Sequence, residues 1–320
     1  MKQNFMKQNF VAASRLAATI ACLLAATALA AEPVKVVVTY SILGEFVERV
    51  GGDAVTVRTL VGRDGDAHTF TPTPRDAVAL AEARLVFENG MGFEPWLAKL
   101  VAGTKSAATV VTVTAGIKPL RPVLEQADHH NEAHGKHAHG EHDVNPHVWH
   151  DVRLTMRMVE NIRDTLAKAD PDRADGYRQR AAAYRAELTA LDEWVTAETA
   201  KLPGARRKIV TSHDTFGYFA VRYGFEVLGT ALGSFSTDVP DPSAKDLAEL
   251  VEKIKAAGVP AVFTENMVNP KVVEQLARAA GVKVAPPLFT DALGPVGSAG
   301  ATYEKLMRHN VRVIVEALRH

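Results

Sequence analysis

Apolar residues recur along the chain at two spacings, one typical of buried strands and the other of amphipathic helices. In the first half, short runs rich in β-branched residues alternate with segments of helical spacing. Strands are predicted at 35–40, 55–61, 85–87 and 109–113, and helices near 76–83 and 95–101. Short strands separated by helices predict parallel βαβ units, and therefore an α/β fold.

The second half shows the same alternation of strand and helix patterns, but its sequence does not repeat that of the first half. Strands are predicted near 208–211, 226–229, 261–264 and 282–285, and helices near 245–257, 271–280 and 303–318. The two halves together predict two lobes, each a parallel sheet flanked by helices.

A charged helical region separates the halves. The segment 152–168 is amphipathic, Pro171 interrupts it, and 172–202 then continues until Pro203-Gly204. A helix of that second length would span roughly 45 Å, which favours a rigid backbone helix joining the lobes over an ordinary pair of surface helices. The predicted domains are an N-terminal α/β lobe at 32–170, a connecting helix at 171–203 and a C-terminal α/β lobe at 204–320.

The first 31 residues have the pattern of a secretory signal peptide. A basic start is followed by a short apolar run at 16–26 and by Ala28-Leu29-Ala30. That run is short for a membrane span, so the pattern predicts export to the periplasm. Cleavage would remove Cys22, the only cysteine, and leave no disulfide and no thiolate ligand. Thr19 makes the alternative, a lipidated Cys22, less favoured.

The balance of charges argues against two classes of partner, and the chain length indicates the number of domains. Lysine plus arginine and aspartate plus glutamate are balanced at 37 each, which argues against nucleic acid and anionic membranes as partners. About 290 residues would remain after cleavage, enough for two domains with sizeable cores. We expect a soluble, exported monomer.

Histidines are concentrated in one stretch. Eight of the twelve fall between His129 and His150, within a predicted His-rich loop at 119–146. Imidazole is the commonest protein ligand for zinc-like metals. Because 119–143 has few apolar residues, we expect it to lack fixed structure without excess zinc. Six histidines are predicted weak accessory zinc sites: His129, His130, His134, His137, His139 and His142. The alternative is a polar linker whose histidines have no role.

Four other metal-capable residues follow predicted strands. His68, His147, His213 and Asp291 all lie beyond the carboxyl ends of those strands, two in each half. Open α/β sheets bind ligands at that edge. A cleft between the lobes would therefore bring all four together.

The chain also resembles the ABC-transporter solute-binding proteins for zinc and manganese, the ZnuA/TroA/AztC type. The resemblance covers nearly the whole mature chain. The motifs that carry it are Ser41-Ile42-Leu43-Gly44, Gly51-Gly52-Asp53, His68-Thr69-Phe70 with Pro72, Pro74, Arg75 and Asp76, Asn89-Gly90, Asn145-Pro146-His147-Val148-Trp149, His213-Asp214 with Phe216-Gly217-Tyr218-Phe219, Pro242-Ser243, and Thr290-Asp291 with Leu293-Gly294.

This resemblance implies two lobes joined by one rigid helix, with a single ion between them held by His68, His147, His213 and Asp291. It implies a high-affinity periplasmic protein that delivers Zn(II) to an ABC permease with its ATPase, with a periplasmic zinc chaperone as a further candidate partner. The His-rich segment fits the zinc members. The disulfide of some zinc members does not carry over.

The ligand set favours zinc. Three imidazoles and one carboxylate suit tetrahedral Zn²⁺, whereas Mn²⁺ prefers more oxygen ligands. Manganese members that resemble this chain typically carry glutamate where His213 stands, and a manganese-binding member is the alternative. Asp66 is either a solvated loop acid, the favoured interpretation, or a support or substitute for a ligand.

Two further alternatives are a zinc-dependent periplasmic enzyme and a zinc buffer without a transporter. A catalytic zinc usually keeps a position open for water, and four protein ligands would close it. The sequence also lacks an H-E-x-x-H motif. We therefore predict no enzymatic activity, unless Asp291 proves detached and Glu265 stands nearby as a base. Genes for a permease and an ATPase beside the gene for this protein would exclude the zinc-buffer alternative.

Overall fold

A computed structural model of the protein describes residues 32–121 and 144–319. The chain from Val34 onward forms one compact unit. The predicted signal peptide lies outside the described residues, as do the six accessory histidines. Within the part that the structure describes, no helix has the length and apolar character needed to cross a membrane.

The first half is built on a four-stranded parallel sheet in the order β2-β1-β3-β4. Its strands are β1 (Val34–Tyr40), β2 (Val55–Val61), β3 (Leu85–Glu88) and β4 (Thr109–Thr112). Successive residues of β1 are buried on opposite faces: Val36 and Val38 belong to the main core and Val37 to a smaller second core. A strand buried on both faces reads as a continuous apolar run, which is why β1 and β3 were predictable.

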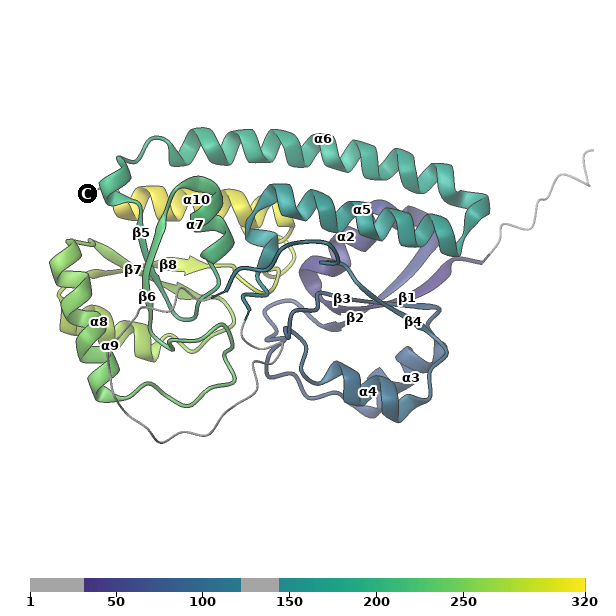
Figure 1. Ribbon diagram of the computed structural model, residues 1–320, viewed down its shortest axis with the longest axis horizontal. Coiled ribbons are helices and arrows are strands. Elements are labelled where there is room, and N and C mark those ends of the chain that lie inside the picture. Colours follow the sequence, from purple (N-terminus) through teal and green to yellow (C-terminus); the bar gives the residue numbers. More distant parts are fainter. Residues whose placement is uncertain (1–31, 122–143, 320) are drawn as a thin grey trace, which may run out of the picture. The chain divides into compact units, whose positions relative to one another are not determined.

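Helices cover both faces of this sheet (Figure 1). They are α2 (Ser41–Gly51), α3 (Pro74–Glu82), α4 (Leu97–Thr104) and α5 (Val152–Ala169). Helices α2 and α5 pack together on the main core, and α3 packs on α4 over the second core.

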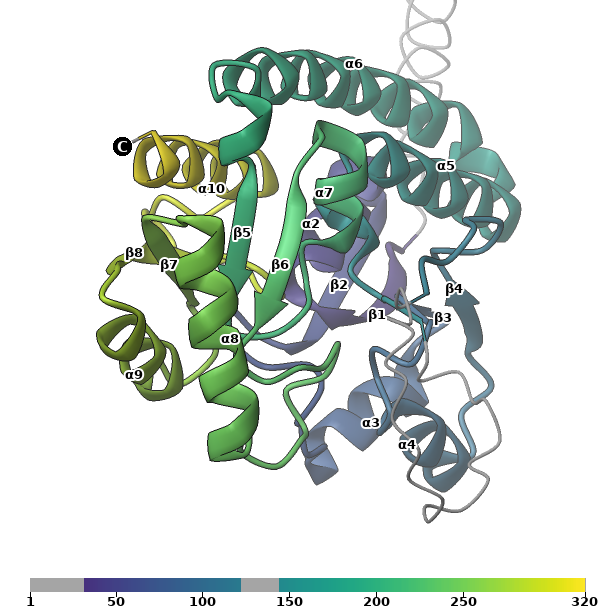
Figure 2. The same ribbon diagram turned by 60° about the vertical axis from the view of Figure 1, so that its left-hand side comes forward.

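The second half contains two parallel strand pairs rather than one continuous ladder. The strands are β5 (Lys208–Thr211) with β6 (Glu226–Thr230), and β7 (Ala261–Glu265) with β8 (Lys283–Leu288). Strands β5 and β7 contact each other, but no backbone ladder joins them among the described residues. The helices are α7 (Gly217–Tyr223), α8 (Ala244–Ala257), α9 (Lys271–Ala280) and α10 (Tyr303–Leu318). Figure 2 shows α8 beside β6, and α9 beside β7 and β8.

The predicted connecting helix is present. After a short 3-10 turn at Pro171–Arg173, α6 (Ala174–Thr199) continues for 26 residues, a length of about 39 Å. It packs on α2 and α5 of the first half and on α10 of the second. The Arg180 guanidinium donates to the carbonyl oxygens of Val50 and Gly51, which end α2. The domain boundaries that the sequence predicts remain a prediction.

Candidate metal centre

The four candidate ligands all lie past the carboxyl ends of strands. His68 follows β2, His147 follows β4 and immediately precedes a 3-10 turn, His213 follows β5, and Asp291 follows β8. All four are buried, and His68 is the most exposed at 3%. The structure thus brings together side chains that are as far apart as 223 positions in sequence, at the sheet edge where ligands are expected.

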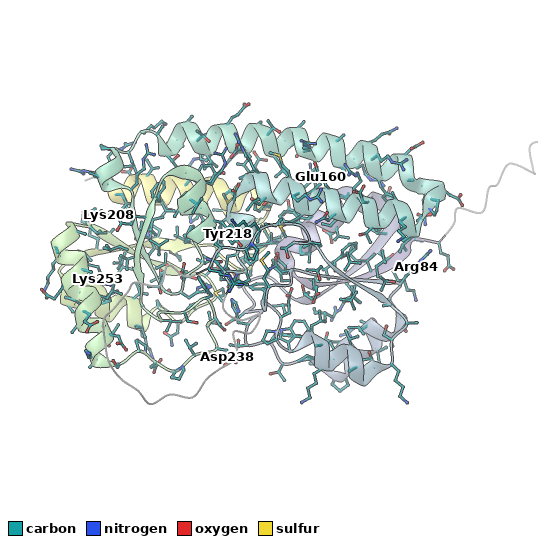
Figure 3. The ribbon with its side chains drawn as sticks, viewed as in Figure 1. Arg84, Glu160, Lys208, Tyr218, Asp238 and Lys253 are labelled. Atoms are coloured by element: carbon teal, nitrogen blue, oxygen red, sulfur yellow. The ribbon has the colours of Figure 1, made fainter. Side chains whose placement is uncertain are left out.

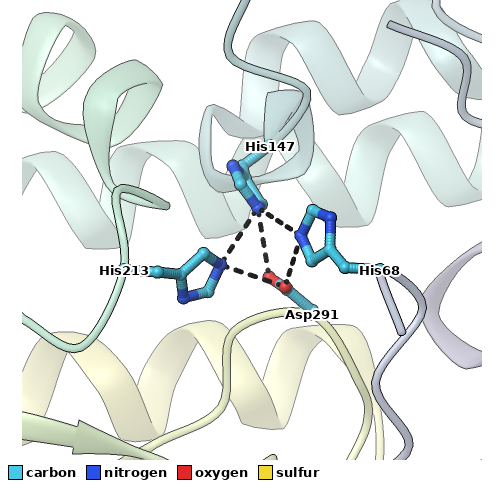
Figure 4. A group of neighbouring side chains, drawn as sticks. All are labelled: His68, His147, His213 and Asp291. Carbon is cyan, nitrogen blue, oxygen red and sulfur yellow. Dashed lines mark hydrogen bonds and ion pairs between the residues drawn. The ribbon is translucent and has the colours of Figure 1, made fainter. Parts of the chain in front are cut away.

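Their ligand atoms converge on one point (Figure 4). The Nε2 atom of His147 lies 3.4 Å from that of His68 and 3.2 Å from that of His213. The Asp291 carboxylate lies 3.3 Å from His68 Nε2, 3.1 Å from His213 Nε2 and 3.6 Å from His147 Nε2. All four ligand atoms lie within 4.8 Å of one another.

These separations fit a tetrahedral metal ion. Bonds of about 2.0–2.1 Å to a central ion would place tetrahedral ligand atoms about 3.3 Å apart. The five separations above, with each Asp291 distance measured to the nearer carboxylate oxygen, span 3.1–3.6 Å, and the remaining His68–His213 separation lies within 4.8 Å. In such a group, unprotonated ring nitrogens would face each other with their lone pairs unless a cation lay between them. The donor set therefore fits a divalent metal.

His213 is held from behind by Glu265, the last residue of β7. Glu265 Oε2 lies 2.6 Å from His213 Nδ1 and accepts a hydrogen bond from Thr290 Oγ1 at 3.0 Å. Its other oxygen accepts from the backbone N–H groups of Ser212 and His213. A carboxylate behind a metal-facing imidazole orients the ring and makes it a better donor.

His147 is held by Asn145, two residues earlier. Asn145 Oδ1 lies 2.9 Å from His147 Nδ1 and also accepts from the His147 backbone N–H at 2.9 Å. A Cβ at Gly217 would come within 2.7 Å of Asn145 Nδ2, so glycine at the start of α7 permits this approach.

Asn145 also closes the base of the segment that contains the predicted accessory histidines. Its backbone N–H donates to Leu120 O at 2.8 Å. Tyr218, which lies near the middle of the unit in Figure 3, accepts from Leu120 N and donates to Asn145 O. The ends of the segment are thus joined beside the candidate ligands.

His68 is positioned by backbone contacts. Its N–H donates to Asp66 Oδ1 at 2.9 Å, and the neighbouring Ala67 carbonyl accepts from Trp96 Nε1 at 2.7 Å. Asp66 Oδ2 also accepts from Thr237 Oγ1 of the second half at 2.6 Å. Asp66 is therefore not a free loop acid, as the favoured interpretation had it: it supports the His68 backbone and lies outside the ligand group.

The electrostatic environment favours the metal-binding forms of two ligands. Burial lowers the pKa of His147 to about 4, which leaves its ring neutral at pH 7. Burial alone would raise the pKa of Asp291, but His213 and His147 hold that pKa well below its ordinary value. Burial likewise opposes protonation of His213, but the carboxylates of Glu265 and Asp291 raise its pKa well above the usual range.

His150 lies outside the ligand group, although it belongs to the same histidine-dense stretch. It is fully buried and stacks on Phe216 with ring centroids 4.7 Å apart. Neither ring nitrogen has a hydrogen-bond partner among the described residues. Burial lowers the pKa of His150 to about 3, so the ring packs as a neutral aromatic group.

A cavity of about 500 Å³ opens beside the candidate ligands, and only His68 among the four lines it. Its other lining residues include Met91, Pro146, Asp214 and Phe235. The cavity provides a path from solvent to the His68 side of the site.

The enzyme alternative required a detached Asp291 with Glu265 nearby as a base. Asp291 instead faces all three imidazoles, and both oxygens of Glu265 are engaged. From the sequence, Glu265 was expected only as a possible base, and its contact with His213 was not predicted. The available signal was an acidic residue directly after the apolar strand predicted at 261–264, at the sheet edge where the ligands lie.

Comparisons with known proteins show which proteins the chain is similar to. A family model described as the periplasmic component A of a zinc-uptake complex matches residues 36–317. The manganese-binding lipoprotein MntA of Halalkalibacterium halodurans is 34% identical over 293 residues, covering 91% of each chain. The zinc-binding protein TroA of Treponema pallidum is 34% identical over 289 residues, covering 88% of each. The solved structure of periplasmic TroA superimposes with a TM-score of 0.78 and 32% identity, covering 90% of this chain and 99% of that one.

Proposed function

Because this chain belongs to the metal-binding solute-binding proteins of ABC transporters, we propose that it captures one Zn²⁺ in the periplasm and delivers it to an import permease with its ATPase. Its family consists of transport proteins and not of enzymes. The ion is the cargo, held by His68, His147, His213 and Asp291 at about 2.0–2.2 Å. A periplasmic zinc chaperone is a further proposed partner.

The observation that supports zinc most directly is the ligand set. Three imidazole nitrogens and one carboxylate at tetrahedral separations match the preference of Zn²⁺. Mn²⁺ favours more oxygen ligands and a higher coordination number. Manganese remains the second candidate, because MntA, named for manganese, is as similar in sequence as TroA.

The test is elemental analysis of untagged protein purified without added metal, followed by competition titration with Zn²⁺ and Mn²⁺. We expect one tightly bound zinc and preference for Zn²⁺. His147→Ala should abolish tight binding, because it removes a nitrogen within 3.2–3.6 Å of all three other ligands. His309→Ala is the matched control, since His309 contacts Pro287 O instead.

Circular dichroism of the metal-free variants would show that both fold. One tight zinc retained by folded His147→Ala would contradict the proposed site. Tight Mn²⁺ that zinc cannot displace would favour the manganese candidate.

A further inference from the structure

The carboxylate of Glu265 has its two oxygens committed to different tasks. Oε1 accepts two backbone N–H groups, from Ser212 at 2.9 Å and His213 at 3.0 Å. Oε2 faces His213 Nδ1 at 2.6 Å and accepts from Thr290 Oγ1 at 3.0 Å. The side chain is fully buried. Because the two backbone donors require an acceptor, they fix which atom of residue 265 faces the imidazole.

This arrangement decides which nitrogen of His213 keeps its proton when a metal ion displaces the other proton and leaves the ring neutral. A neutral imidazole has one N–H and one lone pair. Two lone pairs 2.6 Å apart would repel strongly, so the contact favours a proton on His213 Nδ1, although its present geometry is that of an ion pair and not of an aligned hydrogen bond. Nε2, which lies 3.2 Å from His147 Nε2 and 3.1 Å from Asp291 Oδ2, then presents its lone pair to the ion.

We propose that Glu265 is a positioning residue that holds His213 in the Nδ1-protonated tautomer and, through Thr290, ties the segment carrying Asp291 to the same carboxylate. This inference rests on the proposed metal-binding function. Glu265 thereby joins both ligands of the second half into one preorganised unit. His147 lacks an equivalent carboxylate, since its Nδ1 faces the neutral amide oxygen of Asn145.

Glu265→Gln tests the tautomer with almost no change in shape. The amide oxygen must take the Oε1 position, because an NH₂ group there would meet the N–H groups of Ser212 and His213. The NH₂ group then faces His213 Nδ1 and donates to it. The ring is driven to the Nε2-protonated tautomer, which has no lone pair for the metal.

We expect Glu265→Gln to weaken zinc binding by about 10- to 100-fold, the range for lost support of a metal-binding histidine. The loss should not exceed that of His213→Ala. In the double variant with His213→Ala, the Glu265→Gln change should have little further effect, because the two substitutions remove one interaction. Imidazole ¹⁵N spectra of the metal-free Glu265→Gln variant, recorded at a pH where the ring is neutral, should show the Nε2–H tautomer of His213, a result that general destabilisation would not produce.

Glu94→Gln is the matched control. Glu94 is also buried and accepts the backbone N–H groups of two consecutive residues, Asn89 and Gly90. Its other partner is Thr39 Oγ1 and not a histidine ring. We expect zinc affinity within about threefold of wild type, a difference below 1 kcal/mol.

The zinc affinity of the wild-type protein distinguishes a failure of the proposed function from a failure of the positioning role of Glu265. If the wild type binds no tight metal, the proposed function is wrong. If it binds tightly and Glu265→Gln binds within threefold of it, only the positioning role is overturned. An equal loss from Glu265→Gln in the wild-type and His213→Ala backgrounds would likewise overturn it, because the effect would not pass through His213.

Discussion

The three candidate histidines differ in what stands behind their rings. A carboxylate faces Nδ1 of His213, an amide oxygen faces Nδ1 of His147, and His68 is held through the backbone on either side of it. A ring backed by a carboxylate is the strongest donor of the three. Residue 213 is therefore the position at which a change of ligand should alter metal preference most.

His213→Glu should shift relative affinity from Zn²⁺ toward Mn²⁺, because it exchanges a nitrogen ligand for oxygen. The structure adds a condition: the new carboxylate would lie near Glu265, which would lose its imidazole partner. The double variant with Glu265→Gln should therefore shift the preference further than the single one, by about tenfold. Competition titration measures both. An unchanged Zn/Mn preference in the two variants would show that residue 213 does not set selectivity.

Glu45 gives the metal-free protein a measurable pH dependence. Burial raises the pKa of Glu45 to about 7, from an ordinary value of 4.5. The folded state therefore holds the carboxyl proton of Glu45 more tightly than the unfolded state does. The stability that this proton contributes is fully present below about pH 4.5 and is lost as the pH rises through 7. Glu45→Gln cannot titrate but can still accept the Tyr303 N–H. Relative to wild type, the variant should gain on the order of 1–2 kcal/mol between pH 5 and pH 8.

Urea unfolding at several pH values would measure this difference. Glu82→Gln is the control, because Glu82 is exposed and pairs with Lys35 at the surface. A constant difference between Glu45→Gln and wild type over this pH range would contradict the assignment.

At the residue scale, side chains whose type and position after a strand suggest metal binding could be predicted from the sequence. A residue whose role depends on a tertiary contact could not. His68, His147, His213 and Asp291 follow predicted strands, so their meeting could be expected. The contact of Glu265 with His213 depends on β7 lying beside β5, and strand order is not visible in the sequence.

At the scale of elements, most strands and helices were predictable because their apolar residues recur regularly. Helix α2 was not predicted. It begins at Ser41, directly after β1, and no polar linker marks the change of period. Its buried Ile42, Phe46 and Val50 do recur every four residues, a helical spacing. The separate strand pairs of the second half could not be foreseen, since periodicity reveals strands but not which ladders form.

The contact between Leu120 and Asn145 joins the two ends of the segment that carries the accessory histidines. Deleting 125–142 should leave one tight zinc, because the deletion retains Asn145, which holds His147. It should remove weaker zinc ions and slow loading when metal is scarce, if the histidines raise its local concentration. Replacing the six histidines with serine at constant length is the control for loop length. Unchanged zinc capacity and loading rate after deletion would identify the segment as a linker only.

At the scale of the whole unit, the candidate ligands join two halves that already contact each other around them. Asp64 N donates to Leu293 O, Trp149 Nε1 donates to Thr290 O, and Thr237 bonds Asp66. An ion held by two ligands from each half adds to these links. Its binding free energy therefore stabilises the assembly of both halves, and not one half alone.

Zinc should accordingly raise the unfolding temperature of the whole unit in one transition. At a free concentration 100 times Kd, binding to the native state adds about 2.7 kcal/mol to stability. Differential scanning calorimetry with and without zinc measures the shift. His147→Ala should lose it, whereas His309→Ala should keep it. A zinc-dependent shift confined to one of two separate transitions would contradict joint stabilisation.

The near-complete burial of the four ligands, 0–3% exposed, also has a kinetic consequence. Because the cavity borders only His68 among the four buried ligands, a chelator cannot surround the ion until the ligands part, so escape is a first-order step of the protein itself. When a chelator removes isotopically labelled zinc from the protein, the rate of zinc release should not change with chelator concentration. Residence time and affinity then become separate properties, and a partner that pulls the ligands apart can accelerate unloading without competing for the metal.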